Sequence, residues 1–386
     1  MGKDNPLSTI RHQVVALLAP GELFGGVERH LLGLACGLER RGWKAPLMLF
    51  NDAELAAQAR ELGLDVIVLP RRFPLNPRVA GDLVEALDDS AAGYLHVHGY
   101  RAMVVADLAS RMVGLDLPVI KTEHGLAEPA GLRFVEALKS LVYRGLDDFA
   151  TRSTARVVCY VSGDLMDVKS SAHRGVIRQV VSNGIDALEA GDYDRPGDLP
   201  SDRVLVGMIG RLTDVKGVRY AIDALVMTGT PDIVSLVILG DGPLRDDLAR
   251  HASQLGVADR VLFLGFKRNA YNYLAHFDAL LMPSLHEGLP YTLLEAMSLK
   301  KPILASAVGG LAEVLENGRT GWLFPPRDPS AIAYAIQRLV VEKDAAVQLG
   351  FNAAAVQRER YSLDGMVDHY IEKYIEAAKS EVMKTG

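Results

Sequence analysis

Short apolar segments alternate with longer segments of helical periodicity along most of this chain. The first apolar segment, residues 13–19, precedes a helical pattern at about residues 27–41. Within that pattern, Leu31, Leu34 and Leu38 fall on one face. Further apolar, β-branched segments follow at residues 46–50, 65–69, 94–97, 118–121, 155–161 and 176–181. Strands that alternate with helices predict a parallel sheet with right-handed crossover connections.

The acidic segment 187–202, ALEAGDYDRPGDLPSD, interrupts this alternation. It contains Gly and Pro and has few apolar residues, which is typical of a linker. The alternation then resumes, with apolar segments at residues 204–209, 234–239, 260–264, 279–282 and 302–305. Pro325 and Pro326 end the last strand signal, and helical patterns fill residues 328–379. We therefore predict an α/β protein of two doubly wound, Rossmann-like domains joined near residue 190.

Composition agrees with this architecture and narrows the class of protein. A chain of 386 residues favours two domains, at roughly 150 residues each. With 49% hydrophobic and 23% charged residues it reads as a soluble globular protein, and no apolar run of about 18 residues predicts a membrane span. A net charge of −6 argues against nucleic-acid binding. The polar N-terminus and the lone thiols Cys36 and Cys159 favour a cytoplasmic enzyme.

Ligands of doubly wound sheets bind at the carboxyl ends of strands, and three segments there carry chemistry. Gly25 and Gly26 follow the first strand and begin a helix, which suits a phosphate or simply a tight turn. Arg211 and Lys216 follow the first strand of the second domain. A planar guanidinium and a point charge suit a diphosphate, although two surface cations would look the same in sequence.

The segment LHEGLPYTLLE, residues 285–295, follows another predicted strand. Pro290 is expected in the first helical turn, so that the amides of Tyr291 and Thr292 point at an anion. Glu287 in the loop and Glu295 on the helix accept hydrogen bonds from hydroxyl groups, which suits a sugar or a ribose.

Other polar motifs receive less weight. His124 ends a strand and is the histidine we expect to face a ligand, whereas a metal site made of His96, His98 and His124 is not expected. The DxD motif at residues 192–194 lies in the linker, away from any strand end, and is discounted as a metal site. The GDGP segment at residues 240–243 lacks a third glycine and predicts a tight turn beside a ligand.

Together these motifs resemble glycosyltransferase family 4, the group 1 glycosyltransferases, which are retaining enzymes of the GT-B fold. The matching segments, in chain order, are Gly25-Gly26, TEHG at 122–125, SNGID at 182–186, GRLTDVKG at 210–217, LGDGPL at 239–244, LGF at 264–266, EGLPYTLLEAM at 287–297, Gly309-Gly310 and NGRTGWL at 317–323. The resemblance spans nearly the whole chain.

The resemblance implies a domain of residues 1–186, completed by a helix at about 364–386, on the acceptor side of an interdomain cleft. It implies that residues 187–363 form the nucleotide-sugar domain. The implied catalytic residues are His124, Glu287, Arg211 and Lys216. The implied donor-binding residues are Gly25, Gly26, Arg211, Lys216, Gly265, Phe266, Glu287, Gly288, Tyr291, Thr292 and Glu295.

Within that set, Arg211 and Lys216 are expected to bind the diphosphate, Glu287 the sugar and Glu295 the ribose. The base is expected near Gly265 and Phe266, and His124 and the Gly26 amide are expected at the reacting centre.

The expected reaction moves a hexose from a UDP- or GDP-linked donor to a hydroxyl of a glycan or lipid-linked acceptor. No carboxylate is evidently placed as a nucleophile, so we expect front-face transfer with retention, without a cofactor or a metal. Two alternatives stay open at this point: a sugar-nucleotide epimerase of similar fold and a non-enzymatic two-domain sugar-binding protein. The loop PRRFPLNPR, residues 70–78, has three arginines and no acid, which suits either an anionic membrane surface or a solvated loop.

Overall fold

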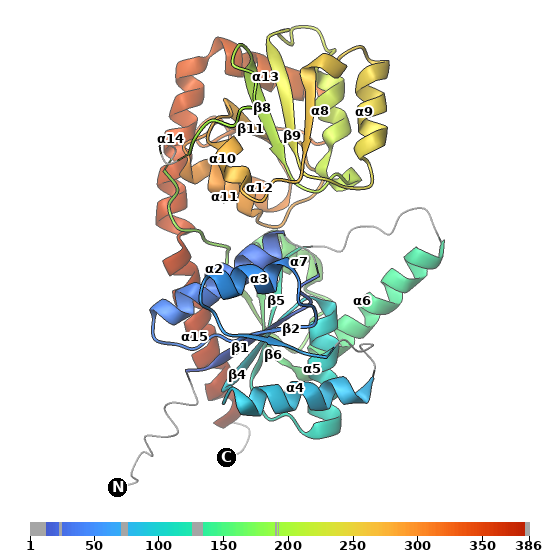
Figure 1. Ribbon diagram of the computed structural model, residues 1–386, viewed down its shortest axis with the longest axis vertical. Coiled ribbons are helices and arrows are strands. Elements are labelled where there is room, and N and C mark those ends of the chain that lie inside the picture. Colours follow the sequence, from blue (N-terminus) through green and yellow to red (C-terminus); the bar gives the residue numbers. More distant parts are fainter. Residues whose placement is uncertain are drawn as a thin grey trace. The chain divides into compact units, whose positions relative to one another are not determined.

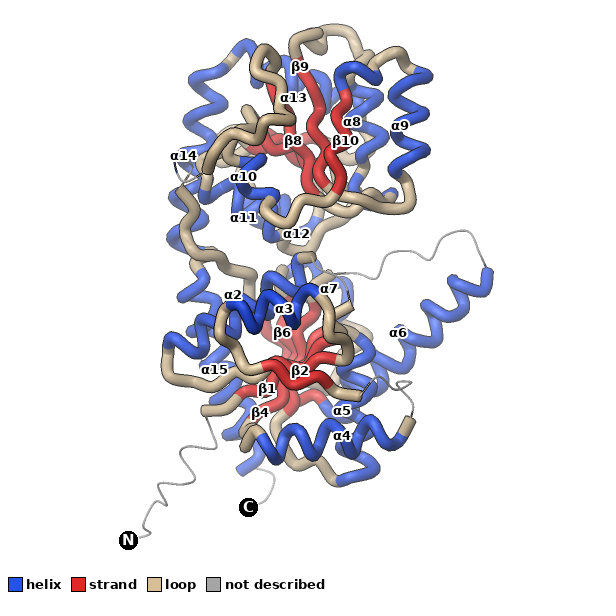
Figure 2. Tube along the Cα trace, viewed as in Figure 1, coloured by secondary structure: helices blue, strands red, loops and turns tan. Residues whose placement is uncertain are grey.

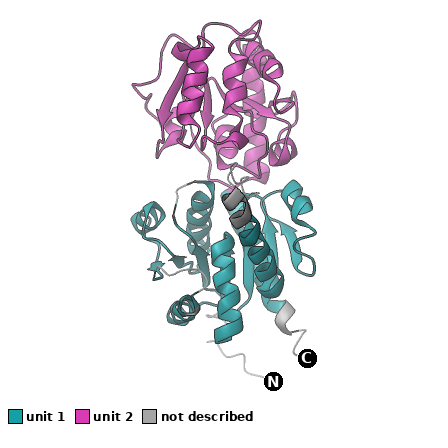
Figure 3. Ribbon diagram, turned by 90° about the vertical axis from the view of Figure 1, so that its right-hand side faces the viewer, with its two compact units in different colours: residues 1–183, 363–386 teal, residues 184–362 magenta. Residues whose placement is uncertain are grey.

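The computed structural model describes residues 13–22, 25–70, 76–125, 134–189, 191 and 193–382. The chain forms two compact units, which Figure 3 colours separately. Unit 1 contains residues 1–183 and 363–386, and unit 2 contains residues 184–362.

Unit 1 is built on a parallel sheet of seven strands in the order β3-β2-β1-β4-β5-β6-β7. The strands are β1 Val15–Ala19, β2 Leu47–Leu49, β3 Val66–Val68, β4 Tyr94–His98, β5 Val119–Glu123, β6 Ala155–Tyr160 and β7 Ile177–Val180. The helices are α2 Gly26–Arg40, α3 Glu54–Glu61, α4 Pro77–Asp89, α5 Tyr100–Val113, α6 Phe134–Thr154, α7 Gly163–Lys169 and α15 Leu363–Val382 (Figure 1).

Unit 2 is built on a parallel sheet of six strands in the order β10-β9-β8-β11-β12-β13. The strands are β8 Val204–Ile209, β9 Val234–Leu239, β10 Val261–Gly265, β11 Ala279–Met282, β12 Ile303–Ser306 and β13 Trp322–Phe324. The helices are α8 Val218–Ala224, α9 Arg245–Gln254, α10 Ala270–Leu274, α11 Tyr291–Ser298, α12 Gly309–Val314, α13 Pro329–Val341 and α14 Lys343–Arg360, with 3-10 turns η2 Asp214–Lys216 and η3 Ala258–Arg260.

These two sheets confirm the predicted doubly wound α/β fold. In each unit the strands lie at the centre, with helices around them (Figure 2). The strand β13 was not predicted as a separate element. No helix in the described ranges is long and apolar enough to cross a membrane.

Each sheet has one point at which the strand order reverses, and the loops there flank a crevice. In unit 1 the reversal lies between β1 and β4, and in unit 2 between β8 and β11. The carboxyl end of β4 carries His98, and β1 is followed by Gly25 and Gly26. In unit 2, Arg211 and Lys216 follow β8, and Glu287 follows β11. The topology therefore brings these residues of each unit to its own reversal point.

The helix α15 packs against α2, although more than three hundred residues separate the two along the chain. A Cβ atom added at Gly37 of α2 would lie 2.4 Å from Cγ2 of Val367, so the two helices approach closely there. Arg41 anchors the start of α15 through Asp364 and Asp368, at 3.0 Å and 2.6 Å. These contacts make α15 an integral part of unit 1.

Candidate active site

The predicted diphosphate and sugar residues of unit 2 meet directly. Lys216 Nζ lies 2.6 Å from Oε1 of Glu287, and Ser284 Oγ donates to the same oxygen at 2.7 Å. The Glu287 side chain is only 8% exposed, whereas that of Lys216 is 27% exposed. Both residues line a small pocket together with Gly210, Arg211 and Ser284. The site therefore offers a cation that solvent can reach and a carboxylate held in one orientation.

Backbone contacts fix the loop that carries Glu287. The amide of Leu285 donates to the carbonyl oxygen of Val215 at 2.8 Å, which ties this loop to the turn η2 that contains Lys216. The amide of Gly310 donates to the carbonyl oxygen of Glu287 at 3.0 Å. A Cβ atom at Gly310 would lie 1.7 Å from the carbonyl oxygen of Gly288, so any larger residue would displace the loop. The loop geometry thus depends on a glycine after β12.

The turn after β9 supports the segment that carries Arg211. The amide of Leu212 donates to the carbonyl oxygen of Asp241 at 2.9 Å. Gly240 has a φ of 134°, and a Cβ atom there would lie 1.9 Å from the carbonyl oxygen of Gly210. The GDGP segment is therefore a packing turn against the loop after β8.

The start of α11 differs from the prediction. Pro290 is the residue before the helix and adopts an extended conformation, so the helix begins at Tyr291. The ring of Pro290 fixes φ without entering the helix, and its carbonyl oxygen accepts from the amide of Leu293 at 3.1 Å. Glu295 is buried one turn into α11, and Thr292 is half-buried.

Gly265 ends β10 and Phe266 follows it with 59% of its surface exposed. Gly288 is buried in the loop before α11. The donor-binding residues predicted for unit 2 therefore lie at the carboxyl ends of strands of one sheet or in the segments that follow those ends.

In unit 1, His124 lies in a cluster of histidines. Its Nε2 atom is 2.9 Å from Nδ1 of His98, and the two rings stack with centroids 5.2 Å apart. The ring of His30, on α2, lies edge-on to that of His124 with centroids 4.7 Å apart. One nitrogen atom from each of these three rings lies within 4.8 Å of the other two.

This cluster of His30, His98 and His124 differs from the set weighed from the sequence, which contained His96 in place of His30. His96 turns to other partners, with Nε2 2.7 Å from Thr122 Oγ1 and Nδ1 2.8 Å from the hydroxyl of Tyr374 on α15. His30 lies beside His98 and His124 in its place, which was not predicted from the sequence. The signal for His30 was a histidine on the buried face of the helix that begins at Gly26.

Gly25 and Gly26 lie at the start of α2, and both are exposed. The amide of Gly25 donates to Oε2 of Glu28 at 2.9 Å. One of the amides at the start of α2 is therefore already hydrogen-bonded to a carboxylate.

Burial keeps the histidine cluster neutral. It lowers the pKa of His30 to about 4, although the hydrogen bond that His30 donates to Asn183 acts to raise it. Burial and the neighbouring imidazoles hold the pKa of His98 well below its usual value, and burial does the same for the pKa of His124. At neutral pH these rings are uncharged donors and acceptors.

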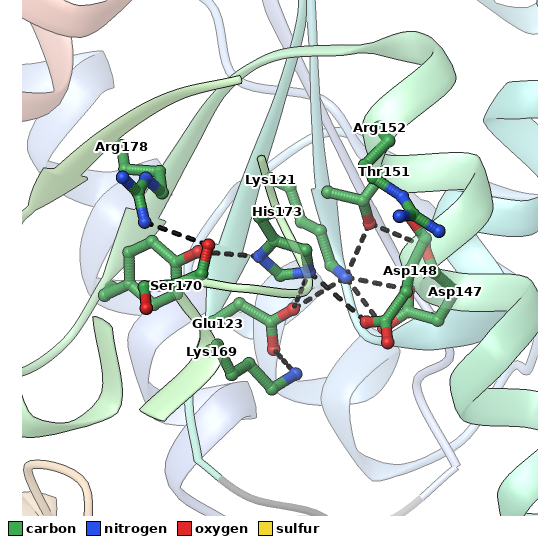
Figure 4. Close-up of polar contacts among 11 residues, drawn as sticks. Lys121, Glu123, Asp147, Asp148, Thr151, Arg152, Lys169, Ser170, His173 and Arg178 are labelled. Carbon is green, nitrogen blue, oxygen red and sulfur yellow. Dashed lines mark hydrogen bonds and ion pairs between the residues drawn. The ribbon is translucent and has the colours of Figure 1, made fainter. Parts of the chain in front are cut away.

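A second polar cluster, near the carboxyl end of β5, was not predicted. The ammonium of Lys121, which is 1% exposed, lies 2.7 Å from Glu123 and 2.7 Å from Asp147 (Figure 4). Lys169 of α7 binds the other oxygen of Glu123 at 2.8 Å. Burial alone would raise the pKa of Glu123, but the two lysines hold it at about 2. The network joins β5, α6 and α7, and Lys121 looked like an ordinary strand residue in sequence.

Some predicted features lie outside the described residues. They are Arg71, Arg72 and Phe73 of the basic loop, and Asp192 of the DxD motif. Arg78 and Asp194 are described and exposed.

Family models match most of the chain. The family model described as glycosyltransferase family 4 matches residues 24–187, and that described as glycosyl transferases group 1 matches residues 191–356. An uncharacterized glycosyltransferase of Methanocaldococcus jannaschii is 26% identical over 374 residues, which cover 92% of this chain and 95% of that protein. The Escherichia coli UDP-Gal:α-D-GlcNAc-diphosphoundecaprenol α-1,3-galactosyltransferase is 29% identical over 64% of this chain and 66% of its own length.

A solved structure extends the likeness to the fold of nearly the whole chain. Anabaena HepE in complex with UDP-glucose superposes with a TM-score of 0.79 and 22% identity, covering 94% of this chain and 99% of that one. The two family models account for both units between them, and this confirms the resemblance seen in the sequence. The chain belongs to glycosyltransferase family 4 and is a retaining, nucleotide-sugar-dependent glycosyltransferase of the GT-B fold.

Proposed function

We propose that unit 2 binds the donor and that the enzyme transfers a hexose from a UDP- or GDP-linked sugar to a hydroxyl of a glycan or lipid-linked acceptor. The observation that carries this proposal is the Lys216–Glu287 pair at the point where the strand order of unit 2 reverses. The ammonium of Lys216 is accessible to solvent, which suits binding of a phosphate. The carboxylate of Glu287 is held in place, which suits hydrogen bonds from sugar hydroxyls. The HepE complex with UDP-glucose supports a uridine nucleotide as the first donor to test.

The proposed roles follow from the chemistry of each group. Arg211 and Lys216 bind the diphosphate, and Glu287 accepts hydrogen bonds from the donor sugar. Glu295 binds the ribose, and the base lies near Phe266, whose exposed ring offers a stacking surface. The amides at the start of α11, including those of Tyr291 and Thr292, add a partial positive charge for an anion.

From unit 1 we propose His124 and the amide of Gly26 as contributions to the reacting centre. In the proposed step, the departing diphosphate takes the proton of the incoming hydroxyl on the same face of the sugar, which retains the anomeric configuration. Arg211 and Lys216 stabilise the negative charge that grows on the diphosphate. Two fixed cations supply the stabilisation that a divalent ion would otherwise give, so we expect transfer without added metal.

A contact with an anionic membrane surface is also proposed, because the E. coli relative acts on an undecaprenol-linked acceptor. In Figure 1, α6 extends outward from unit 1. Leu141, Val142 and Phe149 on this helix are 61%, 52% and 52% exposed, and Arg144 and Arg152 are exposed on the same helix. Apolar side chains beside arginines suit a negatively charged lipid surface, where each basic residue contributes about 1 kcal/mol.

The test of the enzymatic proposal is a screen of UDP- and GDP-hexoses. A bound donor should raise the melting temperature, because it stabilises the native state by mass action. The accepted donor, mixed with hydroxyl acceptors, should release nucleoside diphosphate and give a product whose anomeric linkage has the donor's configuration by NMR. Formation of an epimerised sugar without acceptor, or donor binding without release of nucleoside diphosphate, would contradict the proposed transfer.

The test of the membrane contact is flotation with vesicles. Vesicles of anionic phospholipid should carry the wild-type protein at low salt, and zwitterionic vesicles should not. Replacing Leu141 and Val142 with Ser should abolish flotation. Wild-type protein that stays unbound to both kinds of vesicle would contradict the contact.

A further inference from the structure

His98 and His124 share a hydrogen bond that fixes which nitrogen of His124 carries a proton. His98 Nδ1 lies 2.9 Å from His124 Nε2, and two neutral rings at this distance need one hydrogen between them. His98 is fully buried at the end of β4, whereas His124 is half-buried after β5. The proton can sit on either side, and the surroundings of His98 decide which.

The other nitrogen of His98, Nε2, is buried and has no hydrogen-bond partner among the described residues. If His124 donated, a neutral His98 would carry its own hydrogen on Nε2, and that N–H would be buried without an acceptor. If His98 donates from Nδ1, its Nε2 atom holds only a lone pair. A buried donor without an acceptor is rarer in folded proteins than an acceptor without a donor. The favoured arrangement therefore has His98 as donor and His124 Nε2 as acceptor.

His30 reinforces this arrangement from α2. Its Nδ1 atom lies 3.0 Å from Oδ1 of Asn183, and an amide oxygen only accepts, so His30 carries its hydrogen on Nδ1. Its Nε2 atom is buried and likewise has no hydrogen-bond partner in the described ranges. His30 therefore presents no second N–H to the cluster and packs edge-on against the ring of His124.

We propose that His98 is a positioning residue that holds His124 as the Nδ1–H tautomer. The nitrogen of His124 left for a ligand is then a hydrogen-bond donor, which fits an oxygen of the donor sugar or its phosphate. This inference rests on the proposed role of His124 in transfer. It differs from the default for an imidazole in water, which carries its hydrogen mainly on Nε2.

The test reads the tautomer directly. Protein labelled with 15N at histidine gives well-separated NMR signals for protonated and unprotonated ring nitrogens. His124 in the wild-type protein should show a protonated Nδ1 and an unprotonated Nε2. In His98→Leu, which removes the donor at similar volume, His124 should shift to the Nε2–H form. The value of kcat should fall about 100-fold, with a smaller change in the KM for the donor.

Two further variants separate positioning from packing. His98→Asn can place an N–H near the position of Nδ1, so it should restore the Nδ1–H form and bring kcat to within about tenfold of wild type. His96→Leu removes another buried imidazole from the same strand and should leave His124 as the Nδ1–H tautomer. Melting curves of all variants identify any that fail to fold.

Three results would overturn the proposal. The first is an Nε2–H form of His124 in the wild type, and the second is an unchanged tautomer or kcat in folded His98→Leu. The third is stoichiometric binding of zinc to the wild type that His98→Leu abolishes, because the cluster would then be a metal site. A wild type that shows the Nδ1–H form but transfers no sugar would refute the proposed function and leave the positioning intact.

Discussion

Replacing Glu287 with Gln should separate nucleotide binding from sugar transfer. Glutamine has the shape of glutamate, and its amide oxygen can still accept from Lys216 and from Ser284, which lie 2.6 Å and 2.7 Å from Oε1. The change therefore removes a negative charge and keeps the geometry. Without that charge, Lys216 has no carboxylate competing with a diphosphate.

The expected gain in nucleotide affinity follows from the exposure of the pair. Exposed ion pairs contribute about 0.2–1 kcal/mol, and charge-assisted hydrogen bonds in more enclosed sites contribute about 1.5–3 kcal/mol. Glu287 is 8% exposed and Lys216 is 27% exposed, so the pair lies between these cases and is worth about 1 kcal/mol. Releasing Lys216 from this competition should tighten binding of the bare nucleoside diphosphate about fivefold.

Transfer should move in the opposite direction. If Glu287 accepts hydrogen bonds from the donor sugar, losing its charge should weaken them by about 1.5–3 kcal/mol and lower kcat by roughly 10- to 100-fold. Calorimetry with UDP or GDP measures the first effect, and nucleotide release with acceptor measures the second. Ser284→Ala is the control, because it removes a hydrogen bond from the same oxygen but leaves the charge. A nucleotide affinity that falls tenfold or more in Glu287→Gln would refute the competition argument.

Three further predictions concern binding, metal and stability. The double variant Arg211→Ala, Lys216→Ala should lose about 2–4 kcal/mol of nucleoside diphosphate affinity by calorimetry, and wild-type affinity would remove both from the site. Transfer should survive EDTA, and a loss that manganese or magnesium restores would show that metal is needed. Burial lowers the pKa of His30 to about 4, below the 6.5 of an exposed histidine, so its contribution to stability is complete above pH 6.5 and lost as the pH falls toward 4. The free energy of unfolding, measured with urea, should fall by about 2 kcal/mol between pH 7.5 and 5 because of this loss. In His30→Gln the free energy of unfolding should fall correspondingly less over the same pH range.

Much of the fold could be predicted from sequence because parallel strands buried on both faces leave continuous apolar segments. Such segments marked every strand of the described residues except β13, Trp322–Phe324, which was not assigned an apolar segment of its own. Strand ends also located Arg211, Lys216 and Glu287, since chain order alone places them at one edge of a parallel sheet. Their roles in donor binding stay predictions.

Side-chain partners across the sheet could not be predicted in the same way. Lys121 lies in a strand and pairs with Asp147 of α6, and nothing in the spacing of the two residues marks that pairing. His30 resembled an ordinary helix residue until the fold brought it to His98, which is 68 positions away along the chain. Contacts of this kind depend on which helix covers which strand, and apolar periodicity carries no information about that choice.

The membership of α15 in unit 1 has a consequence for how the protein is made. Tyr370 and Tyr374 belong to the core of unit 1, yet the ribosome synthesises them only after all of unit 2. The first 183 residues therefore emerge without a helix that their core requires, while unit 2 is contiguous and can fold as soon as it is complete. The second domain along the chain should thus be the first to finish folding. A circular permutant that begins at Leu363 would place α15 ahead of β1 and should reverse that order during translation.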